Sequence, residues 1–126
     1  MCDGPRLAGC RILLVEDNFL LAMEIEGVLS GQGCIVLGPV GTIEQALVLL
    51  EGETGPDAAV LDVDLQGRLV TPVAAALLAR GVPFVLVTGY ADPQLGALEL
   101  QGSRRLDKPV SGPELLRTLD QLLTPG

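Results

Sequence analysis

Residues 58–67 read AAVLDVDLQG, an apolar run that ends on Asp62 and Asp64. Four consecutive apolar residues, Ala58 to Leu61, are typical of a strand that is buried on both faces, as in a parallel sheet. Carboxylates at the end of such a strand lose hydration, which raises their free energy unless a cation or another partner compensates. This stretch therefore predicts a buried strand that leads into a site where charged groups gather.

The same apolar pattern recurs on both sides of this stretch, and segments of strand length alternate with segments of helical period. Strands are expected at about residues 11–15, 34–37, 57–61, 83–87 and 103–107. Helices are expected at about residues 18–30, 42–50, 69–79 and 111–123, with a short, weak helix after Asp92-Pro93. Five strands that alternate with helices predict an α/β fold built on a (βα)5 doubly wound parallel sheet.

Length, charge and composition limit the classes of function. The chain has 126 residues, and we expect an N-terminal extension over 1–9 and one domain over 10–126, with no output domain. The formal net charge of −8 argues against nucleic acid and anionic membranes as direct partners. No apolar run is long enough to span a membrane and no signal-peptide pattern opens the sequence, which favours the cytoplasm. Because histidine is absent, zinc sites and histidine-dependent catalysis are disfavoured.

Polar residues follow the carboxyl ends of four of the expected strands. They are Glu16 and Asp17, Asp62 and Asp64, Thr88, and Lys108, which is the only lysine of the chain. Ligands bind at this edge of a parallel sheet, so we expect these side chains to lie together. Carboxylates that meet there repel one another unless a cation binds, and an all-oxygen set of ligands suits Mg²⁺.

This combination of side chains predicts phosphoryl chemistry. A carboxylate beside a bound Mg²⁺ can attack a phosphoryl group and form an aspartyl phosphate. The metal, the ammonium of Lys108 and the hydroxyl of Thr88 would then stabilise the phosphoryl oxygens during transfer.

Four motifs resemble the receiver domains of two-component response regulators, over roughly residues 10–123. ILLVEDN (12–18) is similar to the acidic pair after the first strand of that family, and LDVDLQG (61–67) is similar to its phospho-acceptor segment. VLVTGY (85–90) matches the family's threonine and LDKP (106–109) its lysine. The resemblance implies a flavodoxin-like sheet with the strand order 2-1-3-4-5. It also implies a stand-alone signalling domain rather than an enzyme.

The resemblance implies a role for each acidic residue. Asp62 would accept a phosphoryl group from the phosphohistidine of a sensor kinase. Glu16, Asp17 and Asp62, together with the backbone carbonyl of Asp64, would hold Mg²⁺. The donor would be a sensor histidine kinase or a histidine phosphotransfer protein, and a downstream protein is a further candidate partner. The signal would leave by protein contact or by onward phosphotransfer.

The phosphoryl group itself would be bound by Thr88 and Lys108, and the Lys108-Pro109 peptide bond is expected to be cis. PFVLVTGYAD (83–92) is similar to a single-domain branch called FATGUY. Thr88, Gly89 and Tyr90 are therefore expected to form the conformational switch.

Two positions depart from the family's pattern. Gln66 stands where members usually have proline, a replacement expected to matter little. Arg105 stands where most members carry an aromatic ring that moves inward when the threonine engages the phosphate. Because burying a guanidinium is costly, Arg105 is expected to stay in water.

Two other functions stay open at this point. The chain can be a pseudo-receiver, a docking module that works without phosphorylation. Asp62-Val63-Asp64 also resembles the Asp-x-Asp motif of haloacid-dehalogenase-type phosphatases, which form aspartyl phosphates during turnover. That family places the motif on its opening strand and expects threonine or valine where Gln66 stands.

Overall fold

A five-stranded parallel sheet forms the centre of the protein. The computed structural model describes residues 7–52, 55–89 and 104–124. The strands of the sheet are β1 (Arg11–Val15), β2 (Ile35–Val40), β3 (Ala58–Asp62), β6 (Phe84–Thr88) and β7 (Arg104–Asp107). Their order is β2-β1-β3-β6-β7, and all neighbours pair in parallel. Since these are the first to fifth expected strands, the predicted order 2-1-3-4-5 is confirmed.

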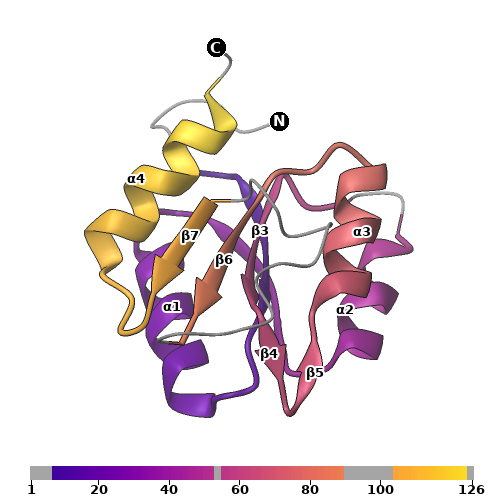
Figure 1. Ribbon diagram of the computed structural model, residues 1–126. Coiled ribbons are helices and arrows are strands. Elements are labelled where there is room, and N and C mark those ends of the chain that lie inside the picture. The colour runs from indigo at the N-terminus through magenta and orange to yellow at the C-terminus, as the bar shows by residue number, and fades with distance from the viewer. Residues whose placement is uncertain (1–6, 53–54, 90–103, 125–126) are drawn as a thin grey trace.

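Helices cover both faces of this sheet. They are α1 (Phe19–Gly31), α2 (Ile43–Leu50), α3 (Thr71–Ala79) and α4 (Gly112–Leu123). Figure 1 shows α1 and α4 on one face and α2 and α3 on the other, which is the doubly wound arrangement. Within the described ranges, none of the helices has the length and apolar character needed to cross a lipid bilayer.

Side-chain caps stabilise the first turns of α1, α2 and α4. These helices begin within one residue of the positions at which the sequence predicts their starts. Asn18 Oδ1 accepts a hydrogen bond from the Leu21 N–H at 2.9 Å. Thr42 Oγ1 accepts from the Gln45 N–H at 3.1 Å, and Ser111 Oγ accepts from the Glu114 N–H at 3.3 Å. Each cap satisfies a backbone donor that has no partner inside the helix.

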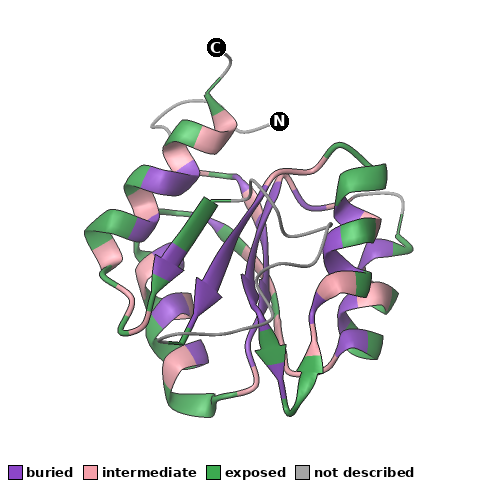
Figure 2. Cartoon of the chain, in the orientation of Figure 1, coloured by how far each residue is buried: buried purple, intermediate pink, exposed green. Residues whose placement is uncertain are grey.

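The core consists of two layers, one on each face of the sheet. Along β1, Ile12 and Leu14 pack on the α1 and α4 side, while Leu13 and Val15 pack on the α2 and α3 side. Figure 2 shows β3 and β6 buried along their whole length. Because both faces of these strands are buried, they read as continuous apolar runs and not as alternating ones. The polar residues at their ends are therefore positioned by a rigid apolar scaffold.

Strand β2 does not end at residue 37, where the sequence predicts its end, but passes through Gly38 and Pro39. The strand continues to Val40, and its pairing with β1 shifts between Leu13 and Val15. As β2 is an edge strand, a proline without an N–H is tolerated there. Gly38 has a φ of +104°, and a Cβ at this position would lie 2.9 Å from the Leu14 carbonyl oxygen. Only glycine fits this close approach to β1.

A short antiparallel hairpin that the sequence did not predict precedes α3 and includes Leu69, the first residue of the helix expected at residues 69–79. It consists of β4 (Asp64–Leu65) and β5 (Arg68–Leu69), and α3 begins only at Thr71. The two loop residues have positive φ values, 54° at Gln66 and 85° at Gly67, as in the turns typical of two-residue hairpins. The weak helix expected after Asp92 lies outside the described residues.

Candidate functional site

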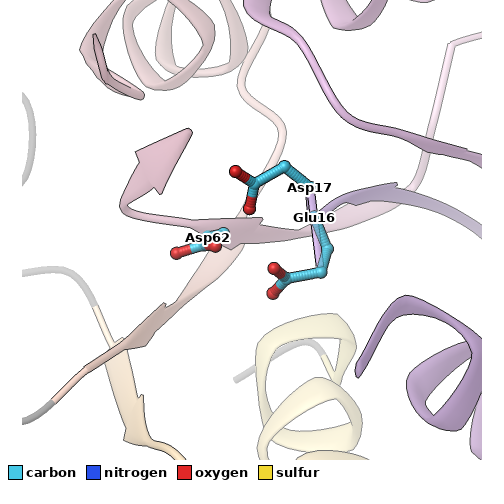
Figure 3. A group of neighbouring side chains, drawn as sticks. All are labelled: Glu16, Asp17 and Asp62. Carbon is cyan, nitrogen blue, oxygen red and sulfur yellow. The ribbon is translucent and has the colours of Figure 1, made fainter. Parts of the chain in front are cut away.

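Three carboxylates converge at the carboxyl end of the sheet. Strand β1 ends at Val15, so Glu16 and Asp17 follow it directly, and Asp62 is the last residue of the adjacent strand β3. One oxygen from each carboxylate lies within 4.8 Å of the others. Figure 3 shows Glu16 and Asp17 leaving the chain in different directions, with Asp62 beside them. The parallel register thus brings together three of the predicted metal ligands.

Two of these carboxylates are almost completely buried. Glu16 and Asp62 are each 4% exposed. Burial, reinforced by the neighbouring Asp62, raises the pKa of Glu16 to about 8. Burial also raises the pKa of Asp62, although Glu16 and Lys108 act in the opposite direction. The site therefore contains more carboxylate than its surroundings stabilise in the charged form.

One buried oxygen of Glu16 has no hydrogen-bond partner among the described residues. Oε2 accepts a hydrogen bond from the Asn18 N–H at 3.1 Å, whereas Oε1 accepts none. An unsatisfied buried carboxylate oxygen is costly unless a cation binds it. This oxygen indicates a place for a metal ion.

Lys108 supplies the nearest positive charge. Its Nζ lies 3.2 Å from Asp62 Oδ2 and 3.8 Å from Glu16 Oε1, and its side chain is 32% exposed. The Lys108 N–H donates to the Thr88 carbonyl oxygen at 2.9 Å, which fixes the residue at the end of β7. The Lys108-Pro109 bond is cis, as expected. A single ammonium thus faces two buried carboxylates.

The side chain of Asp64 stabilises the hairpin, whereas its backbone N–H makes a hydrogen bond to the site. Its Oδ1 accepts a hydrogen bond from the Gly67 N–H at 2.8 Å, and the residue is exposed. The Asp64 N–H donates to Asp62 Oδ1 at 3.2 Å. Asp62 is therefore the buried member of the pair. A metal contact by the Asp64 carbonyl stays a prediction.

Gln66 is tied to the acidic cluster, a role that the sequence did not predict. The Gln66 N–H donates to Asp17 Oδ2 at 3.0 Å, across the carboxyl end of the sheet. Proline, which the family usually has here, lacks an N–H and cannot adopt a φ of 54°. The observed turn and the hydrogen bond to Asp17 both exclude proline at this position, whereas the expectation that the replacement matters little stays a prediction.

Thr88 is buried, and its hydroxyl is bonded to the neighbouring edge strand. It is 2% exposed, and its Oγ1 donates to Asp107 Oδ1 at 3.2 Å. The two residues are register partners of β6 and β7. Asp107 was not among the predicted site residues, since an exposed acid on an edge strand has no distinctive sequence signal.

The remaining switch residues divide between described and undescribed parts of the chain. Gly89 is exposed, and Tyr90 lies outside the described residues. Arg105 is exposed on β7, in agreement with the expectation that it stays in water.

The site can therefore bind a divalent cation beside a nucleophilic carboxylate. Its donors are carboxylate oxygens, which Mg²⁺ prefers. The Lys108 ammonium lies next to the Asp62 carboxylate, and the Thr88 hydroxyl lies on the adjacent strand β6. Both groups can donate hydrogen bonds to an anionic group with several oxygens.

Comparisons with known proteins place the chain in a family. No protein-family model matches it. The receiver domain of the sensor histidine kinase PA1611 from Pseudomonas aeruginosa is 30% identical, with a TM-score of 0.78 over 92% of this chain and 98% of that one. SdrG from Sphingomonas melonis Fr1 is 38% identical, with a TM-score of 0.79 and the same two coverages. The PA1611 structure is described with a magnesium ion coordinated in its active site cleft.

A relative among curated proteins gives weaker support. The transcriptional regulatory protein PdtaR of Mycobacterium tuberculosis is 25% identical over 121 residues, which is 94% of this chain. The chain spans 58% of the length of PdtaR. The fold, the order of the strands and the two structural matches at 30% and 38% identity agree: this chain belongs to the receiver domains of two-component response regulators.

Proposed function

We propose that Asp62 accepts a phosphoryl group from the phosphohistidine of a sensor kinase or of a histidine phosphotransfer protein. The observation that carries this proposal is the convergence of Glu16, Asp17 and Lys108 on one buried aspartate. Phosphorylation of Asp62 brings further negative charge to the site. The ammonium of Lys108 and a cation held by the neighbouring acids would compensate that charge, so Asp62 fits the role of nucleophile.

Mg²⁺ fits the donor set at this place. Glu16, Asp17 and Asp62 would hold it, and Glu16 Oε1, which accepts no hydrogen bond within the described residues, would gain a direct ligand contact. When bound, Mg²⁺ would neutralise negative charge on the phosphoryl oxygens during transfer. The magnesium described for the PA1611 receiver domain supports this choice of metal.

The residues of the chain divide the transfer step between them. An oxygen of the Asp62 carboxylate forms a bond to phosphorus while the phosphorus–nitrogen bond of the donor histidine breaks. The electron pair of that bond stays on the imidazole nitrogen, which then takes up a proton. Lys108, 3.2 Å from Asp62 Oδ2, stabilises the negative charge that arrives with the phosphoryl group. The Thr88 hydroxyl can donate a hydrogen bond to the same group.

The donor protein is proposed to pack on the first turns of α1. Phe19 is 73% exposed, Leu20 72% and Met23 48%, and the helix starts two residues after Asp17. An exposed apolar patch beside a reaction site marks a surface for another protein. Within the same proposal, the phosphorylated chain would signal by contact with a downstream protein or by onward phosphotransfer.

Labelling with acetyl phosphate tests the proposed function. In the presence of MgCl₂ the chain should gain the mass of one phosphoryl group, and EDTA should prevent the gain. Asp62→Asn should abolish it with an unchanged circular dichroism spectrum. Asp64→Asn is the matched control, since Asp64 is exposed and should leave labelling in place. Labelling that persists in Asp62→Asn would refute Asp62 as the acceptor.

A further inference from the structure

We propose that Asp107 is a positioning residue that holds the Thr88 hydroxyl away from Asp62 and so opposes retention of the phosphoryl group. The inference rests on the proposed function of Asp62. It adds a residue to the site that neither the motifs nor the chemistry of transfer requires.

The geometry of three adjacent strands supports this role. β6 lies between β3 and β7, so Thr88 at its end has Asp62 on one side and Asp107 on the other. The Thr88 Oγ1 donates to Asp107 Oδ1 at 3.2 Å. The resting hydroxyl is thus engaged on the side away from the phospho-acceptor.

Burial makes the two positions of the hydroxyl exclusive. Thr88 is 2% exposed, so water does not readily replace a lost acceptor, and a buried hydroxyl needs one. Its acceptors are Asp107 in the resting state and a phosphoryl oxygen after transfer. Because a threonine side chain occupies discrete staggered rotamers, the hydroxyl occupies one position or the other.

Asp107, in contrast, is exposed, and its carboxylate is hydrated when the hydroxyl leaves. The bond to Asp107 therefore lowers the free energy of the resting state, and the phosphoryl group must compete with it. Removing the carboxylate should shift the equilibrium toward the state in which Thr88 engages the phosphoryl group. The size of the shift is that of one hydrogen bond, on the order of fivefold in affinity.

The negative charge of Asp107 can also act directly, by repelling an anion at Asp62. The two effects differ in one respect, because only the positioning effect needs the Thr88 hydroxyl. A double-mutant cycle that joins Asp107→Ala to Thr88→Val separates them.

The experiment measures the apparent affinity of the folded chain for beryllofluoride in MgCl₂, by fluorine NMR of the bound group. Asp107→Ala should bind about fivefold more tightly, and Asp107→Asn should lie between it and the unmodified chain, because a neutral acceptor is weaker. Glu51→Gln removes an exposed acid at the end of α2 and should change nothing. In the Thr88→Val background, Asp107→Ala should have no effect. In Thr88→Ser, which keeps the hydroxyl, Asp107→Ala should again tighten binding. If Thr88→Val does not fold, Thr88→Ala also removes the hydroxyl and takes its place in the cycle.

Several results would overturn the proposal. Equal tightening by Asp107→Ala with threonine or valine at position 88 would assign the effect to charge alone. Unchanged affinity in Asp107→Ala, with normal labelling of Asp62 by acetyl phosphate, would reject the positioning role and leave the proposed function intact. Absence of any labelling at Asp62 would reject both.

Discussion

The ammonium of Lys108 lies 3.2 Å from Oδ2 of Asp62, so the cation that would stabilise a bound phosphoryl group already contacts its acceptor. The two residues are 46 positions apart in the sequence. They meet because β3 and β7 end at the same edge of the sheet, with only β6 between them. This contact connects the charge of the resting site to the chemistry proposed for it.

Replacing Lys108 should slow phosphorylation while the fold is retained. Lys108→Gln leaves the pKa of Asp62 higher still, because Lys108 is one of the groups that lowers it. It also removes a donor to the phosphoryl oxygens, so labelling by acetyl phosphate should slow about a hundredfold. Lys108→Arg keeps the charge in a different shape and should retain part of the rate. A rate in Lys108→Gln equal to that of the unmodified chain would contradict the assigned role.

The pH dependence of stability should reveal the buried Glu16. Unfolded glutamate releases its proton near pH 4.5, whereas folded Glu16 keeps it to about pH 8. Without divalent cations, stability should therefore fall as pH rises through this window, by at most about 4–5 kcal/mol. The raised pKa of Asp62 acts in the same direction. Thermal melts should show this decline, and Glu16→Gln should flatten it.

Addition of Mg²⁺ should have the opposite pH dependence. Because the metal binds ionised carboxylates, the rise in Tm caused by MgCl₂ should grow from about pH 6 to about pH 8.5. The increment should be much smaller in Glu16→Gln. An increment that is independent of pH would show that Glu16 is not a ligand.

Gln66→Pro tests the link between the hairpin and the acidic cluster. Proline removes the N–H that donates to Asp17 and cannot adopt the positive φ of this turn. We expect a loss of about 2–3 kcal/mol of stability and weaker Mg²⁺ binding by calorimetry. Gln66→Asn is the matched control, because asparagine keeps the N–H and tolerates this backbone conformation. Equal Mg²⁺ affinity in the proline variant would show that the hairpin does not position Asp17.

Polar substitutions on α1 should slow phosphotransfer from a protein donor without affecting a small-molecule donor. The double variant Phe19→Ser, Leu20→Ser should slow transfer from a phosphorylated histidine phosphotransfer protein about tenfold and leave labelling by acetyl phosphate unchanged. Val48→Ser and Leu78→Ser are matched controls, since these residues are 63% and 55% exposed on helices of the opposite face. A similar loss in the controls would place the docking surface elsewhere.

The sequence predicted the three central strands, β1, β3 and β6, because they are buried on both faces and so form uninterrupted apolar runs. The ends of those runs then located Glu16, Asp62 and Thr88 at one edge, and the alternation of strands and helices added Lys108 after β7. The hairpin could not be predicted in this way, because Gln66 is not a residue that normally marks a left-handed turn. Asp107 was missed for another reason. Its role depends on the register between β6 and β7, which the sequence does not reveal for an exposed edge strand.

The solitary lysine also makes this chain unusually simple to modify. Reagents that acylate amines modify many lysines in most proteins, but here the only side-chain amine is Nζ of Lys108. That amine is partly exposed beside Asp62, so a bound phosphoryl analogue should shield it. Mass spectrometry of an acylated sample would then give the fraction of chains whose site is occupied, without a radioactive label or an engineered probe.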